Sequence, residues 1–385
     1  MKVLQVAKFY PPERGGIEAV ARDLSAGFVR RGLQVQVLCA HKQWRHEESV
    51  DDLGVRVVRA ASLGMWLSTS MAPSMPWLLW RRRRQADVVH VHMPDPLAAL
   101  AVWLARPRAK VVVHWHSDVI RQRVARHVYR PLEQWLLRRA DAVIATSQAY
   151  AETSPSLRRW RSKVAVIPIG APPPTPPEAG LVRKIRDNYA GRRVVFALGR
   201  MTYYKGWEVL IDAARWLPDD VAVVVAGGGD ALEGYRELVR RADMTDKVRF
   251  FGPMSPRRVE AHFAVAEVFC SSSTVRAEAF GVAVLEAMAR GCPVVATDIP
   301  GSGLGWLQQH AVTGLLVPPG DARALATAIR TLLDDAALRA RMGAAGRERW
   351  ATHFTAETMA DHTVALYGRL LGPVVSQDIE TKRPT

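Results

Sequence analysis

Two basic side chains share one short loop that follows an apolar run. The run Val194–Gly199 predicts a buried strand, and Arg200 and Lys205 come after it, before the next helical stretch. Guanidinium and ammonium groups bind phosphate oxygens, so two cations on one strand-to-helix loop can neutralise a diphosphate. Because Arg and Lys are also common on protein surfaces, the spacing alone leaves a phosphate site and an ordinary solvated loop equally open.

Two glutamates, Glu278 and Glu286, bracket a glycine. Gly281 would break a helix early, so we expect a helix to begin there, with Glu278 in the preceding loop and Glu286 roughly one turn inside the helix. A carboxylate accepts paired hydrogen bonds from the vicinal hydroxyls of a ribose or a hexose. The alternative is one carboxylate placed by the helix dipole and one ordinary surface glutamate, and composition does not separate the two.

Glycine and histidine mark two further loops in the first half. Gly15 and Gly16 precede an amphipathic stretch at 17–30, where backbone N–H groups can approach a phosphate at a helix N-terminus, although tight turns need glycine equally often. This pair is not the G-x-G-x-x-G fingerprint, which disfavours a dehydrogenase. His116 follows the end of a predicted strand at 111–114, from which it can touch a sugar hydroxyl or the reacting centre.

The histidines and cysteines raise the question of a metal. Four histidines are spaced by two along two predicted strands, with a fifth further on: His90, His92, His114, His116 and His127. No carboxylate cluster accompanies them, and the three cysteines lie in apolar runs without C-x-x-C spacing. We therefore predict no metal site and no disulfide framework.

Short β-branched runs alternate with helical stretches through the whole chain. In the first half they are Val3–Ala7, Val35–Ala40, Val55–Val58, Val88–His92, Val111–His114, Ala142–Thr146 and Val164–Ile167. In the second half they are Val194–Gly199, Val221–Gly227, Val248–Phe251, Val268–Ser271, Pro293–Thr297 and Gly314–Val317. Runs that are apolar on both faces predict parallel sheets covered by helices. We predict an α/β fold of two facing, doubly wound, Rossmann-like domains that bind ligands in the cleft between them.

Proline divides the two halves. The segment 171–178 is too rich in proline for a helix or a central strand, so it is the expected linker. It separates an N-terminal domain at 1–170 from a C-terminal domain at 179–355. We predict a helix at 356–371 that packs back on the N-terminal domain, and a disordered tail at 373–385.

The formal net charge of +16 is unevenly distributed over the 385 residues. Residues 1–170 hold 27 Lys and Arg against 13 Asp and Glu, whereas the rest of the chain holds 26 against 24. A basic half attracts nucleic acid, an anionic membrane leaflet or a phosphorylated substrate, unless it only solubilises the chain. Tryptophans beside a run of arginines favour a membrane surface, where rings lie at headgroup depth and guanidiniums meet phosphates. The candidate membrane and acceptor contacts are Trp77, Trp80, Arg81, Arg82, Arg83 and Arg84.

Taken together, the motifs resemble those of one enzyme family. They are Gly15-Gly16-Ile17-Glu18, His90-Val91-His92, His116-Ser117-Asp118, Gly199-Arg200, Lys205-Gly206, Gly227-Gly228-Gly229-Asp230, EAFGVAVLE at 278–286 and TGLLVPPGD at 313–321. Over about residues 1–370 the chain resembles the retaining nucleotide-sugar glycosyltransferases of the GT-B fold, family 4. The stretches 115–139 and 167–170 are similar to bacterial mannosyl- and rhamnosyltransferases that use GDP-sugars in O-antigen or exopolysaccharide synthesis. Ile169 is a departure, because many relatives have Asn there.

The resemblance implies a role for each matching residue. The implied catalytic residues are His116, Arg200, Lys205 and Glu278, and the implied donor-binding residues are Gly15, Gly16, Gly228, Phe280, Gly281 and Glu286. Arg200 and Lys205 would stabilise the donor diphosphate as it leaves. Glu278, with the backbone N–H groups of Phe280 and Gly281, would bind the donor hexose. Glu286 would hold the ribose hydroxyls, and His116 would lie near the anomeric carbon.

The implied reaction is the retaining transfer of a hexose, mannose or a deoxyhexose, from a GDP-sugar to a polyprenyl-diphosphate-linked saccharide. No metal or other cofactor is implied, and the Asp-x-Asp triad that metal-dependent transferases use does not occur in the sequence. No apolar run reaches the ~18 residues of a membrane span, and the N-terminus lacks the pattern of a signal peptide. We therefore expect a cytoplasmic protein, peripheral at the inner face of the plasma membrane.

Other functions stay open at this point. They are a UDP-sugar-dependent family-4 transferase with a different acceptor, a nucleotide-sugar epimerase that shares the fold, and a non-catalytic polyanion-binding protein. The sequence carries no helix-turn-helix or RNA-binding signature, so we predict no nucleic-acid partner. An epimerase would need further carboxylates in the cleft of the first domain, but this domain is poor in acidic residues.

Overall fold

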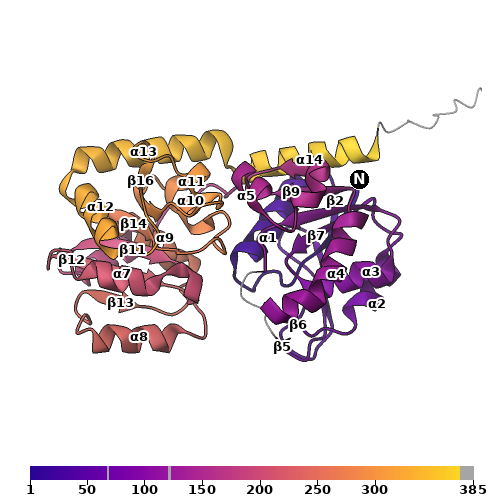
Figure 1. Cartoon of the computed structure of the whole chain (residues 1–385), viewed down its shortest axis with the longest axis horizontal. Helices are drawn as coiled ribbons and strands as arrows, with labels where there is room; N and C mark the ends of the chain where they lie inside the picture. Colours follow the sequence, from indigo (N-terminus) through magenta and orange to yellow (C-terminus); the bar gives the residue numbers. More distant parts are fainter. Residues whose placement is uncertain (67–68, 120–122, 373–385) are drawn as a thin grey trace, which may run out of the picture.

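The computed structural model describes residues 1–66, 69–119 and 123–372, with the side chains at 123–126 left aside. Its ribbon forms two lobes side by side, each built on one large sheet (Figure 1). The predicted α/β class, with two doubly wound Rossmann-like domains, is confirmed. The predicted disordered tail at 373–385 lies outside the described residues.

The first lobe contains an eight-stranded sheet in the order β10-β9-β8-β7-β1-β2-β4-β3. Its strands are β1 (Lys2–Val6), β2 (Gln34–Ala40), β3 (Glu47–Val50), β4 (Arg56–Ala60), β7 (Val88–Met93), β8 (Lys110–Trp115), β9 (Ala142–Ala145) and β10 (Val164–Val166). All neighbours pair in parallel except β3, which is antiparallel to β4. A separate antiparallel ribbon joins β5 (Met65–Trp66) to β6 (Thr69–Ser70). The helices are α1 (Gly16–Arg30), α2 (Met75–Arg82), α3 (Pro96–Ala105), α4 (Arg123–Arg139), α5 (Gln148–Thr153) and the 3-10 turn η1 (Arg158–Lys163).

The second lobe contains a six-stranded parallel sheet in the order β13-β12-β11-β14-β15-β16. Its strands are β11 (Arg193–Leu198), β12 (Val221–Ala226), β13 (Val248–Phe250), β14 (Val268–Ser271), β15 (Val294–Thr297) and β16 (Gly314–Val317). Its helices are α6 (Ala179–Asp187), η2 (Tyr203–Lys205), α7 (Trp207–Ala214), α8 (Leu232–Arg241), α9 (Pro256–Val265), α10 (Val282–Ala289), α11 (Leu304–Leu307), α12 (Ala322–Asp334) and α13 (Ala336–His353). The last helix, α14 (Ala356–Leu371), runs over the first lobe (Figure 1).

Helices cover both faces of each sheet, so the central strands are fully enclosed. The strands β7 and β12 are buried along their whole length, which is why their sequences are unbroken apolar runs. One buried cluster joins the first sheet to α2, α3 and α4, and a second joins the other sheet to α7 and α12. A third cluster includes residues of α1 and α14 together with residues of α9 and α10, so the apolar core continues from one lobe into the other.

The strand order reverses once in each sheet. In the first sheet β1 lies between β2 and β7, and in the second β11 lies between β12 and β14. At such a reversal the connections leave toward opposite faces, so a crevice opens at the carboxyl ends of the two central strands. The loops after β1, β7, β11 and β14 are therefore the best-placed segments for binding a ligand.

The chain crosses between the lobes twice, and the crossings lie side by side. The backbone N–H of Ala171 donates to Phe354 O (2.9 Å), and that of Ala356 donates to Ala171 O (3.0 Å). Ala171 and Thr355 form an isolated parallel bridge. A motion of one lobe against the other therefore has to bend both crossings together.

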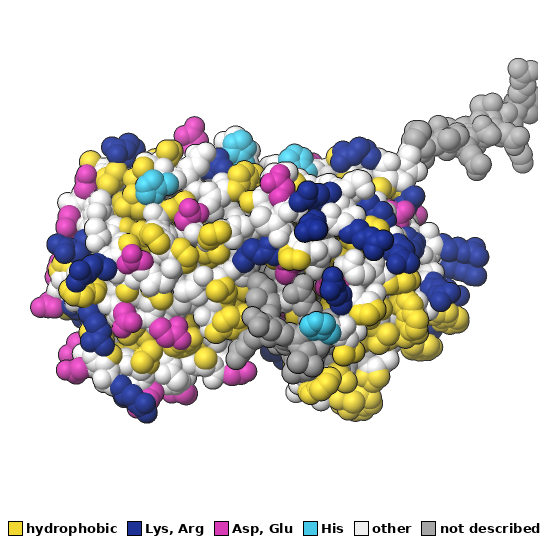
Figure 2. Space-filling view, viewed as in Figure 1, with side chains coloured by type: hydrophobic (Ala, Val, Ile, Leu, Met, Phe, Trp, Pro, Cys, Tyr) yellow, Lys and Arg dark blue, Asp and Glu magenta, His cyan; other side chains and the backbone are white. Residues whose placement is uncertain are grey.

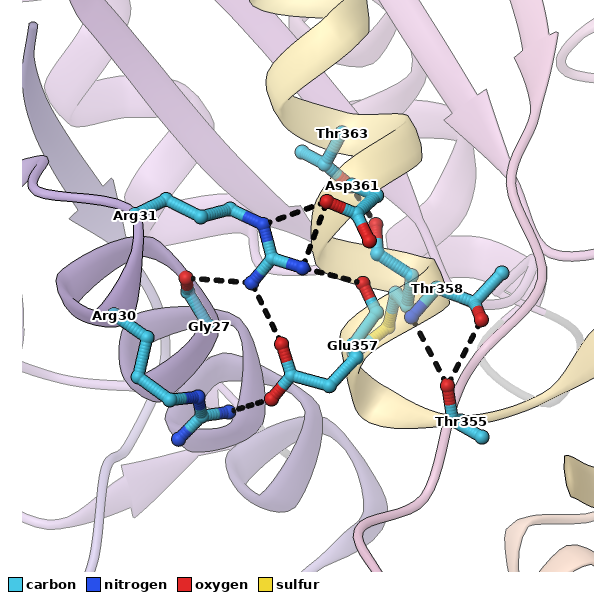
Figure 3. A network of polar contacts seen from close by, with 9 residues as sticks. Gly27, Arg30, Arg31, Thr355, Glu357, Thr358, Asp361 and Thr363 are labelled. Carbon is cyan, nitrogen blue, oxygen red and sulfur yellow. Dashed lines mark hydrogen bonds and ion pairs between the residues drawn. The ribbon is translucent and has the colours of Figure 1, made fainter.

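A charged network fixes α14 on α1 (Figure 3). Arg31, just after the end of α1, donates from Nε to Asp361 Oδ1 (2.8 Å) and from Nη1 to Glu357 Oε2 (2.7 Å) and Gly27 O (2.9 Å). Arg30 pairs with the other oxygen of Glu357 at 2.5 Å. The end of the described chain is thereby tied to the first lobe, so α14 moves with that lobe rather than with the second.

Candidate active site

Loops at the two reversals bring five charged side chains together, and we call them the interlobe charges. They are Lys8 after β1, Glu18 in the first turn of α1, Arg200 and Lys205 after β11, and Glu278 after β14. Arg200 interacts electrostatically with Lys8 and Glu18 of the first lobe and with Glu278 of its own lobe. The charged loops of the two lobes therefore face each other.

Lys205 and Glu278 form the central ion pair of this group. Lys205 Nζ lies 2.5 Å from Glu278 Oε2, and Ser273 Oγ donates to the same oxygen at 2.9 Å. The two charged side chains are only 12% and 9% exposed. Burial alone would lower the pKa of Lys205 and raise that of Glu278, but their mutual attraction, with help from Tyr204 for Lys205 and from Ser273 and Arg200 for Glu278, outweighs it, so the pKa of Lys205 is raised and that of Glu278 is lowered. Both groups are therefore charged, and among the described residues no group donates a hydrogen bond to Glu278 Oε1.

The backbone around these residues explains how the loop after β11 is held. Ser272 Oγ donates to Lys205 O (2.9 Å), and Trp207 Nε1 donates to Arg200 O (3.1 Å). Gly206 has a φ of 62°, and a Cβ there would collide with Ser272 O. The loops after β11 and β14 thus pack directly on each other, which places Lys205 beside Glu278.

Glu286 lies on α10 and interacts electrostatically with a carboxyl group of the other lobe. Burial raises the pKa of Glu286, with Arg290 acting against this and Glu260 adding to it. Burial, reinforced by the charge of Glu286, raises the pKa of Asp23 on α1 to about 7. The two carboxyl groups are therefore close enough to interact, so α1 and α10 contribute side chains to the same region of the candidate site.

The glycine loop of the first lobe abuts the start of α10. Gly281 has a φ of 95° at the N-cap and offers no side chain to the first N–H groups of α10, and Phe280 before it is buried. A Cβ on Gly16 would come within 3.6 Å of Val282 Cγ2. An anion at this place would meet an uncapped helix N-terminus from one lobe and the backbone of Gly15 and Gly16 from the other.

Gly228 lies in the loop after β12, beside the loop that carries Arg200. The backbone N–H of Met201 donates to Gly228 O at 2.9 Å. The structure thus gathers the predicted residues of the second lobe, since Gly228, Arg200, Lys205 and Glu278 all lie on strand-end loops of one sheet edge.

Four buried histidines cluster along β7 and β8 and just beyond β8; three of their rings are stacked, and that of His90 is tilted against them. The four are His90, His92, His114 and His116. Nitrogens of the first three lie within 4.8 Å of one another, a grouping that can hold a metal ion. Both nitrogens of His90 have partners, Tyr367 Oη at 2.5 Å and His114 Nδ1 at 3.2 Å, and both nitrogens of His92 are also hydrogen-bonded. The absence of a metal stays a prediction.

Hydrogen bonding assigns a tautomer to His116. Gln5 Nε2 donates to Ser25 Oγ (2.7 Å) and Ala21 O (3.2 Å), so Gln5 presents Oε1 to His92 Nε2 at 2.7 Å. That nitrogen must carry the hydrogen, and because burial lowers the pKa of His92 to about 3, its Nδ1 is an acceptor. His116 Nε2, 2.9 Å from this Nδ1, is then the donor. Burial also lowers the pKa of His116, which leaves its Nδ1 as an unprotonated acceptor.

Several residues of this region were missed by the sequence analysis. Lys8 follows β1 at the reversal, and Asp23 lies on the helix that follows Gly15 and Gly16. Arg276, two residues before Glu278, contacts the first lobe. The rule that ligands bind at reversals would have drawn attention to Lys8, whereas the contacts of Asp23 and Arg276 depend on how the lobes face each other.

One predicted membrane contact is wrong. Arg82 is buried, and its Nη2 donates to Glu48 Oε1 at 2.6 Å while Nη1 donates to Leu78 O at 3.3 Å. The arginines of the run point in different directions because they lie at the end of a helix, and the side of α2 that carries Arg82 faces the protein. Arg82 therefore serves the fold and is not available to a membrane.

The remaining predicted contacts belong to a larger surface, which we call the basic-apolar face. Trp77 and Trp80 are 53% and 47% exposed, and guanidinium groups lie over their rings at 4.8 and 4.1 Å. The ribbon of β5 and β6 adds side chains that the sequence analysis missed. The face consists of Leu63, Met65, Trp66, Met71, Trp77, Trp80, Arg81, Arg83 and Arg84. Figure 2 shows hydrophobic side chains gathered at the lower right, where Figure 1 places β5, β6, α2 and α3.

Two family models match the chain, one for each lobe. The model described as "Glycosyl transferases group 1" matches residues 181–349, and the model described as "Glycosyl transferase 4-like domain" matches residues 15–170.

Curated proteins match over nearly the whole chain. It is 30% identical to the O-antigen chain mannosyltransferase C of Escherichia coli, covering 96% of this chain and 99% of the relative. It is 33% identical to the D-rhamnosyltransferase WbpZ of Pseudomonas aeruginosa (92% and 93%). It is 29% identical to a GDP-mannose-dependent α-(1-6)-phosphatidylinositol monomannoside mannosyltransferase of Mycobacterium tuberculosis (91% and 94%).

Solved structures share the fold. The sucrose-phosphate synthase of Thermosynechococcus elongatus superimposes with a TM-score of 0.82 at 24% identity, covering 96% of this chain and 98% of that one. Anabaena HepE, in complex with UDP and glucose, superimposes with a TM-score of 0.79 at 22% identity, covering 95% and 99%.

The tautomer of His116 can be read by NMR. In protein labelled with 15N-histidine, we expect long-range 1H–15N spectra to show His92 and His116 as Nε2–H tautomers between about pH 5 and pH 8. Gln5→Leu removes the acceptor that orients both rings and should give mixed tautomers. Gln34→Leu, at an exposed glutamine on β2, is the matched control and should change neither ring. An Nδ1–H tautomer of His116 in the unmodified protein would contradict the assignment.

Proposed function

Because the chain belongs to the GT-B glycosyltransferases of family 4, we propose that it moves a hexose from a GDP-sugar to a lipid-linked saccharide with retention of configuration. The hexose we propose is mannose or a deoxyhexose, and the pathway is the synthesis of a cell-surface polysaccharide such as O-antigen or exopolysaccharide. The names of the relatives support this choice, since they include mannosyl- and rhamnosyltransferases. The observation that carries the proposal is the meeting of Arg200, Lys205 and Glu278 at the reversal of the second sheet.

The chemistry needs positive charge beside the leaving group. Breaking the glycosyl–phosphate bond leaves positive character on the sugar and negative charge on the diphosphate. Arg200 and Lys205 are held in place before the reaction, so they stabilise that charge without reorganisation. The acceptor oxygen bonds to the anomeric carbon on the face from which the diphosphate leaves, and its proton passes to a diphosphate oxygen. In this scheme neither a divalent metal nor another cofactor is required.

Glu278 has two tasks in this proposal. Its charge keeps Lys205 protonated inside a partly dehydrated site, because each group stabilises the ionised form of the other. Its Oε1, which has no hydrogen-bond donor within the described part of the chain, is proposed to accept a hydrogen bond from a hexose hydroxyl. His116 Nδ1, also an acceptor, is proposed to hold another hydroxyl near the anomeric carbon. Two acceptors at fixed positions orient the sugar for attack.

The nucleoside part of the donor is assigned to α10 and to the loop of Gly228. Glu286 is proposed to bind the ribose hydroxyls, and the uncapped N-terminus of α10 with Gly15 and Gly16 is proposed to approach the phosphates. A GDP-sugar is favoured because a relative is named as GDP-mannose-dependent. A UDP-sugar with a different acceptor is the second candidate, because HepE, which shares the fold, binds UDP and glucose.

The first lobe is proposed to take the acceptor at an anionic membrane. No helix of the described residues is long and apolar enough to cross a bilayer. The basic-apolar face offers tryptophans for the headgroup layer and arginines for lipid phosphates. A polyprenyl-diphosphate-linked saccharide would lie at such a surface, so we propose a cytoplasmic protein that is peripheral at the inner face of the plasma membrane.

A non-catalytic polyanion-binding protein remains the remote alternative. It would use the basic surface of the first lobe and would have no use for a buried Lys205–Glu278 pair at a sheet reversal. An ion pair that costs desolvation is better explained by a site that needs both charges.

A donor screen tests the proposal. We expect transfer from GDP-mannose or a GDP-deoxyhexose, with a product of the donor's anomeric configuration by NMR, and no loss of rate in EDTA. Arg200→Ala should lower kcat by about 10²–10³-fold, because it removes one stabilising donor at the developing charge. Arg215→Ala, at an exposed arginine of the same lobe, should leave kcat unchanged. Glu278→Ala should abolish most transfer, and an intact rate in that variant would overturn the proposed site.

Vesicle sedimentation tests the membrane contact. We expect the protein to sediment with vesicles that contain anionic lipid and to be released by high salt. Arg81→Ala/Arg83→Ala/Arg84→Ala should weaken binding by about 10²-fold, at roughly 1 kcal/mol for each arginine near the surface.

A triple variant of the second lobe serves as the matched control for the vesicle experiment. Arg236→Ala/Arg240→Ala/Arg241→Ala removes the same charge from α8 and should sediment like the unmodified protein. Binding that survives both the substitution of Arg81, Arg83 and Arg84 and high salt would rule out this surface.

A further inference from the structure

One arginine of the second lobe reaches into the first. Arg276 lies in the loop between β14 and α10, and its guanidinium forms an ion pair with Asp118. Its Nη1 also donates to Thr153 Oγ1 at 3.0 Å, and its Cζ lies 4.7 Å from the centre of the Tyr150 ring. The arginine side chain is 19% exposed and that of Asp118 is 3% exposed. The pair is therefore a largely dehydrated contact between the lobes.

Hydrogen bonds within the first lobe fix the position of Asp118 for this contact. Trp115 Nε1 and Ser154 Oγ both donate to Asp118 Oδ1, at 3.0 and 2.7 Å. The backbone N–H of Asp118 donates to Tyr150 Oη at 2.6 Å. Two hydrogen bonds on one carboxylate oxygen leave Oδ2 for Arg276. Because a buried carboxylate is costly unless its charge is compensated, the first lobe presents a fixed acceptor for one cation.

The partners of this pair stand beside the residues of the proposed site. Asp118 is two residues after His116, and Arg276 is two residues before Glu278. Moving either partner therefore moves a loop that carries a proposed catalytic residue. Around the pair the lobes also touch elsewhere: Thr153 Oγ1 donates to Gly301 O at 3.2 Å, and a Cβ on Gly303 would lie 2.9 Å from Ser147 Oγ.

We propose that Arg276 is a positioning residue, and that its ion pair with Asp118 latches the two lobes so that the His116 loop is set against the Glu278 loop. The inference rests on the proposed function for what the positioned loops do, but not for the latch itself. Removing one partner leaves the other buried and uncompensated, which favours a separation of the lobes that admits water. The apolar cluster that continues from one lobe into the other opposes this separation, so we expect a partial opening rather than the unfolding of either lobe.

The latch is tested first without any substrate. We expect Arg276→Gln and Asp118→Asn each to increase the radius of gyration by small-angle scattering and to speed amide exchange in both segments 147–154 and 272–280. Arg339→Gln is the matched control, because Arg339 is 21% exposed and pairs with Glu267 inside the second lobe. It should leave the radius and both segments unchanged. Unaltered scattering and exchange in both latch variants would overturn the proposal, whatever the activity.

A double variant then tests whether the residues act as one contact. With a donor that the enzyme accepts, each single variant should lower kcat by about 10²-fold with a smaller change in KM, because the substitution misplaces the two loops but removes no group that binds the donor. Arg276→Gln/Asp118→Asn should lose no more than the worse single variant. Losses that multiply in the double variant would show two independent roles and contradict the latch.

Discussion

The ion pair between Lys205 and Glu278 is the interaction on which the site depends. It exists because two loops at the reversal of one sheet pack on each other, so that an ammonium and a carboxylate share one partly buried position. Either group alone would be costly there, but together each keeps the other ionised. The result is an ammonium group that is fixed before a substrate arrives, and together with the guanidinium of Arg200 it supplies the positive charge that a departing diphosphate requires.

The fold places residues of the first lobe opposite this ion pair. The first sheet reverses next to β1, which brings Lys8, Glu18 and the glycine pair to face the second lobe. The two crossings at 171 and 355 lie side by side, and α14 is tied to α1, so the lobes are joined by these crossings and by a common apolar cluster rather than by a shared sheet. Such an arrangement allows the lobes to move as bodies, and it gives contacts between their facing loops control over the geometry of the site.

Much of the fold follows from local sequence. Strands such as β7 and β12 are buried on both faces, so unbroken apolar runs identify them, and Gly281 marks the start of α10 because only glycine tolerates its backbone conformation there. The exposed edge strand β3 and the two-residue strands β5 and β6 were missed, because they bury too little to leave an apolar run.

The residues of the candidate site likewise differ in whether local sequence identifies them. Arg200, Lys205 and Glu278 carry local signals, since they follow strands, whereas Asp23 and Arg276 owe their importance to the opposite lobe. Arg82 was assigned to the surface from its arginine-rich surroundings, but the direction of each side chain depends on the face of α2 that packs inward.

Chemical rescue at position 205 tests the central claim most directly. Lys205→Cys removes the ammonium, and alkylation of the new thiol with bromoethylamine restores one. Burial raises the pKa of Cys39, Cys270 and Cys292 to about 12, so the introduced thiol is the reactive one. The account predicts that hexose transfer falls by about 10²–10³-fold in the unalkylated variant, returns on aminoethylation, and does not return with neutral iodoacetamide. Full transfer by the unalkylated variant, or no recovery after aminoethylation verified by mass, would contradict it.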